Sequence, residues 1–99
     1  MIRAKERRFT ASDINMDKLE VSKQRTLTQG DTVTTVYKVT DGKHRVSAHY
    51  RPDLDADHRW MLAGHIDPDI PHRQFSMSTD DDAASQLIDR IAAAAKRLG

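Results

Sequence analysis

Cysteine is absent from this sequence of 99 residues. The chain therefore has neither a disulfide framework nor a thiolate zinc site, which fits a reducing compartment. No apolar stretch approaches the length of about 18 residues that a membrane-spanning helix needs. The basic residues 1–8 have no apolar segment behind them, so they do not resemble a secretory signal. We expect a cytoplasmic protein that does not act on membranes.

Catalytic and cofactor motifs are also missing. The four glycines stand singly, so there is no glycine-rich phosphate loop. Serine, histidine and aspartate do not take the spacing of a nucleophile elbow. The acidic run at residues 80–82 is explained by the favourable position of negative charge at a helix N-terminus. The sequence predicts a protein that is not an enzyme and has no cofactor.

Charge is unevenly distributed along the chain. Residues 1–50 contain ten Lys and Arg against six Asp and Glu, a net charge of +4. Residues 51–99 contain six against nine, a net charge of −3, which leaves +1 for the whole chain. A basic half of this kind indicates either an anionic partner or a solvated surface.

The clearest structural pattern is a β-hairpin over residues 32–51. Residues 32–40 are rich in β-branched side chains, Asp41-Gly42 suits a two-residue type I′ turn, and residues 43–51 alternate. Such a turn opposes Lys38 to Arg45. It places on the expected core face Val33, Thr35, Tyr37, Val39, Val46, Ala48 and Tyr50. The opposite, open face then contains Thr34, Val36, Lys38, Arg45, Ser47, His49 and Arg51.

Residues 19–28 predict a strand before this hairpin, joined to it by a three-residue turn. The turn pairs Leu27 with Val33 and Val21 with Val39. It also puts two cations on the core face, Lys23 and Arg25. Either these side chains snorkel beyond the cover of the helix, or the register differs.

Residues 79–98 predict an amphipathic helix, whose apolar stripe is Ala84, Leu87, Ile88, Ile91, Ala95 and Leu98. Thr79 is its expected N-cap. With further strands at 58–66 and 73–78, the fold class is α+β: an antiparallel meander of four to five strands with one C-terminal amphipathic helix packed on one face. We expect residues 1–17 to form a basic, partly disordered arm and residues 18–99 a single domain.

Two sets of charged side chains are the candidate binding sites. Like charges opposite each other slightly destabilise a sheet, so the expected opposition of Lys38 to Arg45 indicates either an anionic partner or neutralisation by a residue such as Glu20. The basic face consists of Lys38, Arg45, His49, Arg51 and Arg59. The acidic loops contribute Asp53, Asp55, Asp57, Asp67 and Asp69.

Two further patterns have a binding and a structural interpretation. His65, Asp67, Asp69 and His72 supply donor atoms suited to a divalent cation, but the prolines among them favour a polar loop, and we expect no metal. Trp60 suits an interface hot spot, but its alternation with Leu62 favours core packing.

In size, lack of cysteine and sheet-plus-helix layout, the chain resembles small accessory proteins of phages and mobile elements, including inhibitors of bacterial defence. The leading hypothesis is a small non-enzymatic binding or regulatory protein that docks on a protein partner through one of the charged sets or an exposed strand edge. The alternative is a sequence-tolerant nucleic-acid-binding module that uses the basic arm and the open face. An exposed edge strand would also allow a homodimer.

Overall fold

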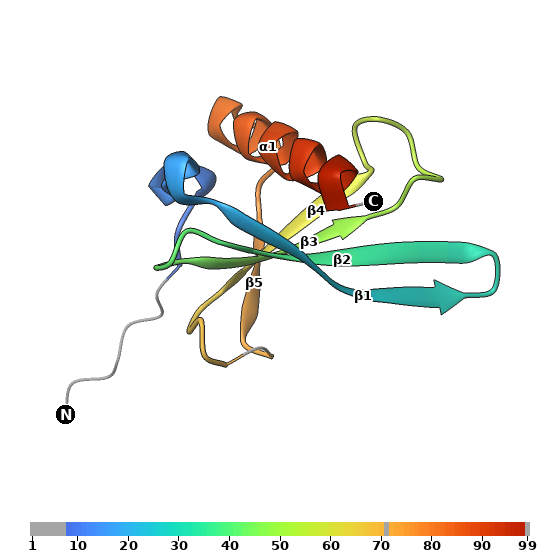
Figure 1. Ribbon diagram of the computed structural model, residues 1–99, viewed down its shortest axis with the longest axis horizontal. Helices are drawn as coiled ribbons and strands as arrows, with labels where there is room; N and C mark the ends of the chain where they lie inside the picture. Colours follow the sequence, from blue (N-terminus) through green and yellow to red (C-terminus); the bar gives the residue numbers. More distant parts are fainter. Residues whose placement is uncertain (1–7, 71, 99) are drawn as a thin grey trace.

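The computed structural model describes residues 8–70 and 72–98, and shows a curved antiparallel sheet beside one long helix (Figure 1). Two short 3-10 helices, Ala11–Asp13 and Met16–Lys18, precede the sheet. The five strands and the helix are β1 (Glu20–Gln29), β2 (Thr32–Thr40), β3 (Arg45–Tyr50), β4 (Trp60–His65), β5 (Gln74–Met77) and α1 (Asp82–Leu98).

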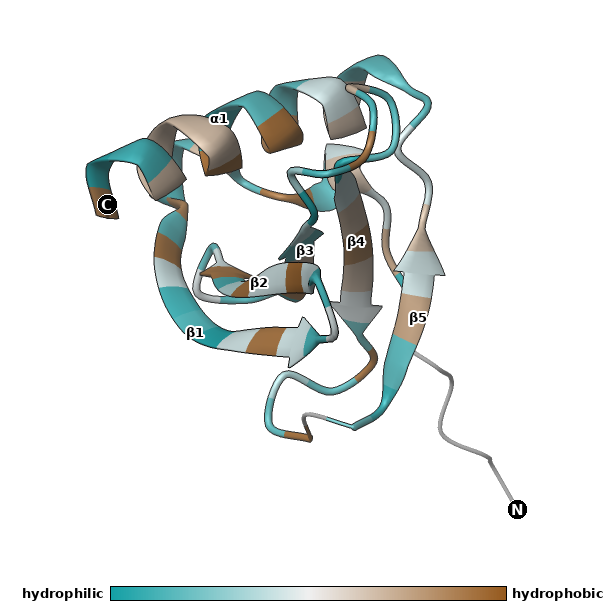
Figure 2. Cartoon of the chain, turned by 90° about the vertical axis from the view of Figure 1, so that its right-hand side faces the viewer, coloured by the Kyte–Doolittle hydropathy of each residue, from teal (hydrophilic) through white to brown (hydrophobic). Residues whose placement is uncertain are grey.

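The sheet is a meander, because each strand pairs antiparallel with the next one in the sequence, in the order β1-β2-β3-β4-β5. The helix α1 lies over one face of it (Figure 2). The expected α+β class with a C-terminal helix is confirmed, with five strands. β1 and β5 are the two edges of the sheet, and β1 is much the longer.

The connection between β2 and β3 is a four-residue loop, not the expected type I′ turn. Thr40 pairs with Arg45, which leaves residues 41–44 in the loop. Asp41 Oδ1 accepts hydrogen bonds from the backbone N–H groups of Lys43 at 2.9 Å and His44 at 2.6 Å. Such side-chain bonds to the following backbone replace the bonding of a tight turn. A type I′ turn also needs two residues with positive φ, and in this loop only Gly42 has it, at 92°.

This loop shifts the register of the hairpin by two residues. Lys38 therefore faces Ser47, and the predicted opposition of Lys38 to Arg45 is wrong. Since side chains alternate with a period of two, a shift of two residues leaves each side chain on its predicted face. The core side indeed holds Tyr37 opposite Ala48 and Val39 opposite Val46, and all four are buried.

A β-bulge in β1 moves one of the two cations predicted on the core face, Arg25, to the open face, whereas Lys23 stays on the core side. The predicted pairing of Val21 with Val39 is confirmed, and Lys23 lies opposite Tyr37. The register then shifts between Lys23 and Arg25, so that Arg25 lies opposite Val36 on the open face.

Beyond the bulge, the turn between β1 and β2 is shorter than expected. Gln29 pairs with Thr32, which leaves only Gly30 and Asp31, and Gly30 takes the positive φ of 59° that the tight turn requires. The predicted pairing of Leu27 with Val33 is therefore wrong, because Leu27 faces Thr34.

The helix α1 begins later than predicted, and Asp81 caps it. The Ala84 N–H donates to Asp81 Oδ1 at 2.7 Å, and the Ser85 N–H donates to the Asp81 backbone carbonyl at 3.0 Å. The prediction of Thr79 as N-cap is wrong, because Asp81 caps equally well and its charge also suits the helix dipole. Among the described residues, no helix has both the length and the apolar character needed to cross a membrane.

The core lies between α1 and the central strands. Ala84, Leu87 and Ile91 are fully buried against the sheet, as is Ala48 of β3. The predicted core residue Val33 is instead 42% exposed, because the far half of the β1–β2 hairpin extends beyond the helix (Figure 1). A single helix thus covers the middle of the sheet and leaves the hairpin end uncovered.

The segment before β1 also contributes to this core. Ala11 and Ile14 are buried, at 2% and 6% exposure. Phe9 packs edge to face against Phe75, with 5.2 Å between the ring centroids. The buried core therefore includes residues that precede position 18 in the sequence. Residues 1–7 of the predicted arm lie outside the described residues.

The side chain of Asp41, in the β2–β3 loop, connects the segment before β1 to the sheet through hydrogen bonds. Its Oδ2 accepts the Asn15 N–H at 2.9 Å and lies 3.0 Å from Nδ1 of the His44 ring. Burial alone would raise the pKa of Asp41, but hydrogen bonds from Asn15, His44 and Lys43 hold it far below its usual range. One carboxylate thus joins the β2–β3 loop to the 3-10 segment.

We predict that Gly64→Ala destabilises the fold by about 1–3 kcal/mol, the usual cost of overpacking. Gly64 lies opposite Phe75, and a Cβ there would stand only 2.4 Å from Phe75 Cζ. Urea denaturation measures the effect. A Phe75→Leu background removes the ring, so the double variant should lose less stability than the sum of the single ones; simple additivity would contradict this explanation.

We predict that Asp41→Asn lowers the free energy of unfolding at pH 7 by about 1–3 kcal/mol, through weakened or unsatisfied buried hydrogen bonds. Because the folded-state pKa of Asp41 is depressed, its contribution is present above the unfolded pKa of about 3.9 and is lost as the pH falls below it. Acid denaturation of the variant should therefore be shallower below pH 4 than that of the wild type. The control is Asp31→Asn at an exposed turn, and equal acid slopes for both variants would refute the assignment.

Candidate binding surfaces

Part of the predicted basic face lies on the side of the sheet opposite α1. Lys38 is exposed there in the middle of β2. Arg45 is half-buried, and its Nη1 donates to the Pro68 carbonyl at 3.2 Å, while its Nε is buried without a partner among the described residues. Arg45 therefore holds the loop after β4 against the sheet, and Lys38 is more accessible than Arg45.

The other two arginines of the predicted basic face, Arg51 and Arg59, form hydrogen bonds with residues of the β3–β4 loop beside them. Arg51 binds Asp53 through two contacts, Nη2 to Oδ2 at 2.6 Å and Nε to Oδ1 at 3.2 Å, and this bond lowers the pKa of Asp53. Arg59 donates from Nε to the Leu54 carbonyl at 2.9 Å. Both side chains thus hold the β3–β4 loop, and the five predicted cations do not form one accessible surface.

The bulge in β1 adds a cation that the sequence analysis placed elsewhere. Arg25, Val36 and His49 lie side by side across three strands of the open face. Burial, and then the charge of Arg25, lower the pKa of His49 and favour its neutral form. The accessible positive charge of this face therefore comes from Arg25 and Lys38.

The predicted acidic residues form two separate groups. Asp53, Asp55 and Asp57 lie in the β3–β4 loop, and Asp67 and Asp69 lie in the β4–β5 loop, at opposite ends of β4 (Figure 1). Each group is partly occupied by contacts within its own loop. Asp55 Oδ1 lies 2.6 Å from His58 Nδ1, and Asp67 Oδ1 accepts the Asp69 N–H at 2.9 Å.

Asp57 lines a cleft that the sequence did not reveal. The cleft has a volume of about 640 Å³ and is bordered by Asp80 and Asp89 as well, with Trp60 and Ile88 among its apolar walls. Trp60 is half-buried and lies 4.6 Å from the Tyr50 ring, between centroids, so it serves both the core and this cleft. Only the tertiary structure brings the loop beside the start of α1.

Ser47 and His65 are hydrogen bonded in the interior, with Ser47 Oγ 2.8 Å from His65 Nε2. Nucleophilic catalysis uses a pair of this kind, but here both side chains are buried, at 4% and 2% exposure. Burial, with the charges of Arg45 and Lys38, also lowers the pKa of His65. In the part of the chain that the structure describes, no group of three or more His, Asp or Glu side chains is placed to hold a metal ion. The Nε2 atom of His65 is directed to the Ser47 hydroxyl instead.

The outer edge of β1 is the longer of the two edges of the sheet. Nine of its ten residues are exposed, and only Val21 is half-buried. An edge strand presents unpaired N–H and C=O groups, which another strand can bind. The opposite edge, β5, has only four residues, so β1 is the stronger candidate for pairing.

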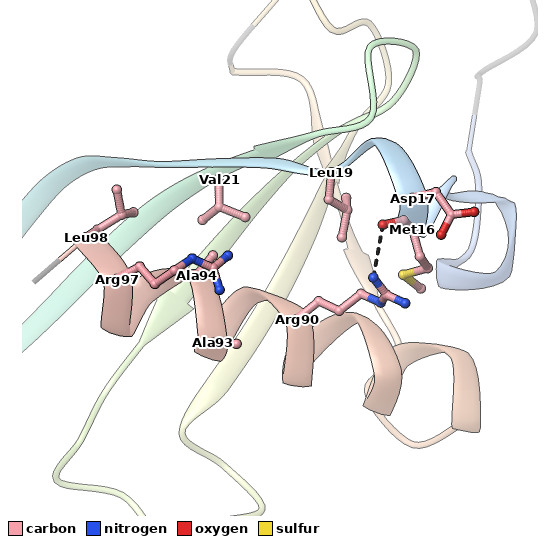
Figure 3. A pocket seen from close by; sticks show the side chains of 9 residues that line it. All are labelled: Met16, Asp17, Leu19, Val21, Arg90, Ala93, Ala94, Arg97 and Leu98. Carbon is pink, nitrogen blue, oxygen red and sulfur yellow. Dashed lines mark hydrogen bonds between the residues drawn. The ribbon is translucent and has the colours of Figure 1, made fainter.

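A groove of about 480 Å³ runs between β1 and α1. Figure 3 shows Leu19 and Val21 on one side of the groove and Arg90 and Arg97 of α1 on the other, with Leu98 at one end. Between Arg90 and Arg97, α1 presents the small side chains of Ala93 and Ala94, and their methyl groups do not fill the space beside β1.

Two arginines of α1 line the groove. Arg90 Nη1 donates to the Met16 carbonyl at 3.3 Å, which fixes the 3-10 helix Met16–Lys18, just before β1, to α1. Neither Arg90 nor Arg97 is among the site residues predicted from the sequence. Their seven-residue spacing, with alanines between them, does place them on one helical face, but only the packing of α1 shows that this face lies beside β1.

Comparisons with protein-family models, with curated proteins and with solved structures found no match to this chain.

Proposed function

We propose that this protein is a non-enzymatic binding module that docks on a protein partner by accepting a strand at the edge of β1. The observation that carries this proposal is the ten-residue edge strand with almost every residue exposed. Strand addition of this kind gains affinity from main-chain hydrogen bonds and specificity from pockets for alternate side chains. The groove beside β1 would supply such a pocket.

The details of β1 favour a selected partner over indiscriminate pairing. Bulges and charged side chains are devices that protect edge strands from aggregation, and β1 has a bulge between Lys23 and Arg25. The regular stretch before the bulge, residues 20–23, lies next to the groove. Residues 20–23 are thus the part of the edge where a groove can select the partner.

The burial of the hydrogen-bonded Ser47 and His65 supports a role without chemistry. The serine and histidine that have the geometry of a catalytic pair, Ser47 and His65, are both buried. A protein that acts only by covering the surface of another protein would function as an accessory or inhibitor protein. This agrees with the resemblance of the chain, in size and layout, to small accessory proteins of phages and mobile elements.

We predict that partner binding slows hydrogen exchange along β1. Tagged protein would capture its partner from an extract of the source cells, and exchange measured by mass spectrometry would compare the free and bound forms. The outward-pointing amides among residues 20–23, which are every second one in an antiparallel edge strand, should become protected because they gain acceptors. The internal control is β5, which should be unchanged. Protection confined to other surfaces would refute docking at β1.

One observation favours the nucleic-acid alternative, namely that the bulge brings Arg25 to the same open face as Lys38. Two accessible cations are few for a phosphate-binding surface, and Arg45, Arg51 and Arg59 have partners within the chain. The main aromatic side chains lie on the core side, which leaves no stacking platform on this face. We therefore rank this function second.

We predict no binding of single- or double-stranded DNA or RNA at physiological salt, measured by fluorescence anisotropy. Binding at low salt that falls steeply as salt rises would favour the nucleic-acid function, since it reports release of counterions from phosphates. In that case Arg25→Glu/Lys38→Glu should abolish it. Lys43→Glu/Arg73→Glu makes the same charge change at exposed positions outside the strands of the sheet and should not.

A further inference from the structure

We propose that the groove between β1 and α1 selects an extended peptide segment with one acidic side chain flanked by apolar ones, in the pattern apolar–x–acidic–x–apolar. This inference rests on the proposed docking at β1 and adds the chemistry of the partner. It is carried by the charge and apolar character of the groove lining, taken with the free strand edge beside it.

The direction of side chains in an added strand follows from the sheet. The side chains of β1 that face α1 include Val21 and Lys23, since they lie opposite Val39 and Tyr37 on the core side. A strand added outside β1 would continue this alternation, so every second side chain would enter the space beside Ala93 and Ala94. The groove is therefore in the place where a sixth strand would bury its inward side chains.

The charge in the groove favours an acidic partner. Arg97 is exposed and has no hydrogen-bond or ion-pair partner among the described residues, and Arg90 uses only Nη1, on the Met16 carbonyl. Lys23 adds a third positive charge on the same side of β1. The one acidic group in the lining is Asp17, at the Met16 end (Figure 3). A guanidinium binds a carboxylate through well-directed, charge-assisted hydrogen bonds.

The spacing of Arg90 and Arg97 along α1 indicates how many acidic side chains the bound peptide would place in the groove. Arg90 and Arg97 are about 10.5 Å apart along the axis, because each residue rises about 1.5 Å. Inward side chains of an extended strand are separated by about 6.7 Å. One carboxylate placed midway is then within reach of both guanidinium groups, and the inward neighbours on either side meet apolar ends of the groove, at Leu19 and Leu98.

Three capped heptapeptides test this chemistry. Each alternates threonine with inward residues, which are leucine, a central residue and leucine, and the central residue is aspartate, asparagine or lysine. Titration into isotope-labelled protein, followed by NMR, measures affinity and location together. We expect the aspartate peptide to bind at least about tenfold more tightly than the lysine peptide, with shifts in β1 and in the second half of α1.

Two matched variants locate the charge selection. Arg97→Glu should abolish the preference for the aspartate peptide over the lysine peptide, because the two remaining cations, Arg90 and Lys23, are then balanced by the new glutamate and Asp17. Lys96→Glu makes the same charge change in the same helical turn, and it also removes a positive charge that interacts favourably with the helix dipole at the C-terminus. Lys96 lines a different cavity, however, together with Tyr50 and Trp60. It should retain the preference for aspartate. Circular dichroism confirms that both variants keep the helix.

Several outcomes would overturn the inference. Equal binding of the three peptides with shifts in β1 would remove the acidic selection while leaving docking at β1 intact. Shifts elsewhere, or no binding at millimolar peptide, would remove the groove as a peptide site, and the exchange footprint of the natural partner decides the proposed function separately. A wild-type dimer in sedimentation, with β1 at its interface, would show that a second copy of the chain occupies the edge.

Discussion

The constraint behind this structure is that a single helix has to cover one face of a five-stranded sheet. With 17 residues, α1 is about 25 Å long, and it is about 10 Å wide, whereas five strands span about 19 Å from the first axis to the last. The helix buries Leu87 and Ile91 over the middle strands. The far half of the β1–β2 hairpin consequently remains uncovered (Figure 1), and the space beside β1 is only partly filled.

The remaining edges of this thin core are closed by polar contacts and by the segment before β1. Asp41 connects the β2–β3 loop to Asn15, and Arg45 connects the sheet to the loop after β4. Ala11 and Ile14 extend the buried cluster at that end. Several charged groups that sequence inspection offers as binding sites are therefore structural, because a small domain has few apolar residues with which to fix its loops.

The function we propose follows from the backbone groups at the edge of β1 that have no partner strand in the sheet. Charged side chains of the loops mostly find partners nearby, whereas the outer N–H and C=O groups of β1 face no neighbouring strand in the sheet. The alanines of α1 leave a groove beside the same strand, and Arg90 and Arg97 border it. Unpaired backbone, apolar walls and net positive charge thus occur together at one edge of the molecule.

Sequence alone determined an antiparallel meander of four to five strands, the helix and the two faces of the hairpin, because hydrophobic periodicity depends only on local geometry. It did not determine the β2–β3 register, which the hydrogen bonds of Asp41 set, or the bulge that turns Arg25 outward. It also could not show that Arg45 is held by Pro68 or that Arg97 lies beside Val21. Only the tertiary structure decided these contacts, because they join residues far apart in the chain, whose meeting depends on how α1 and the loops pack.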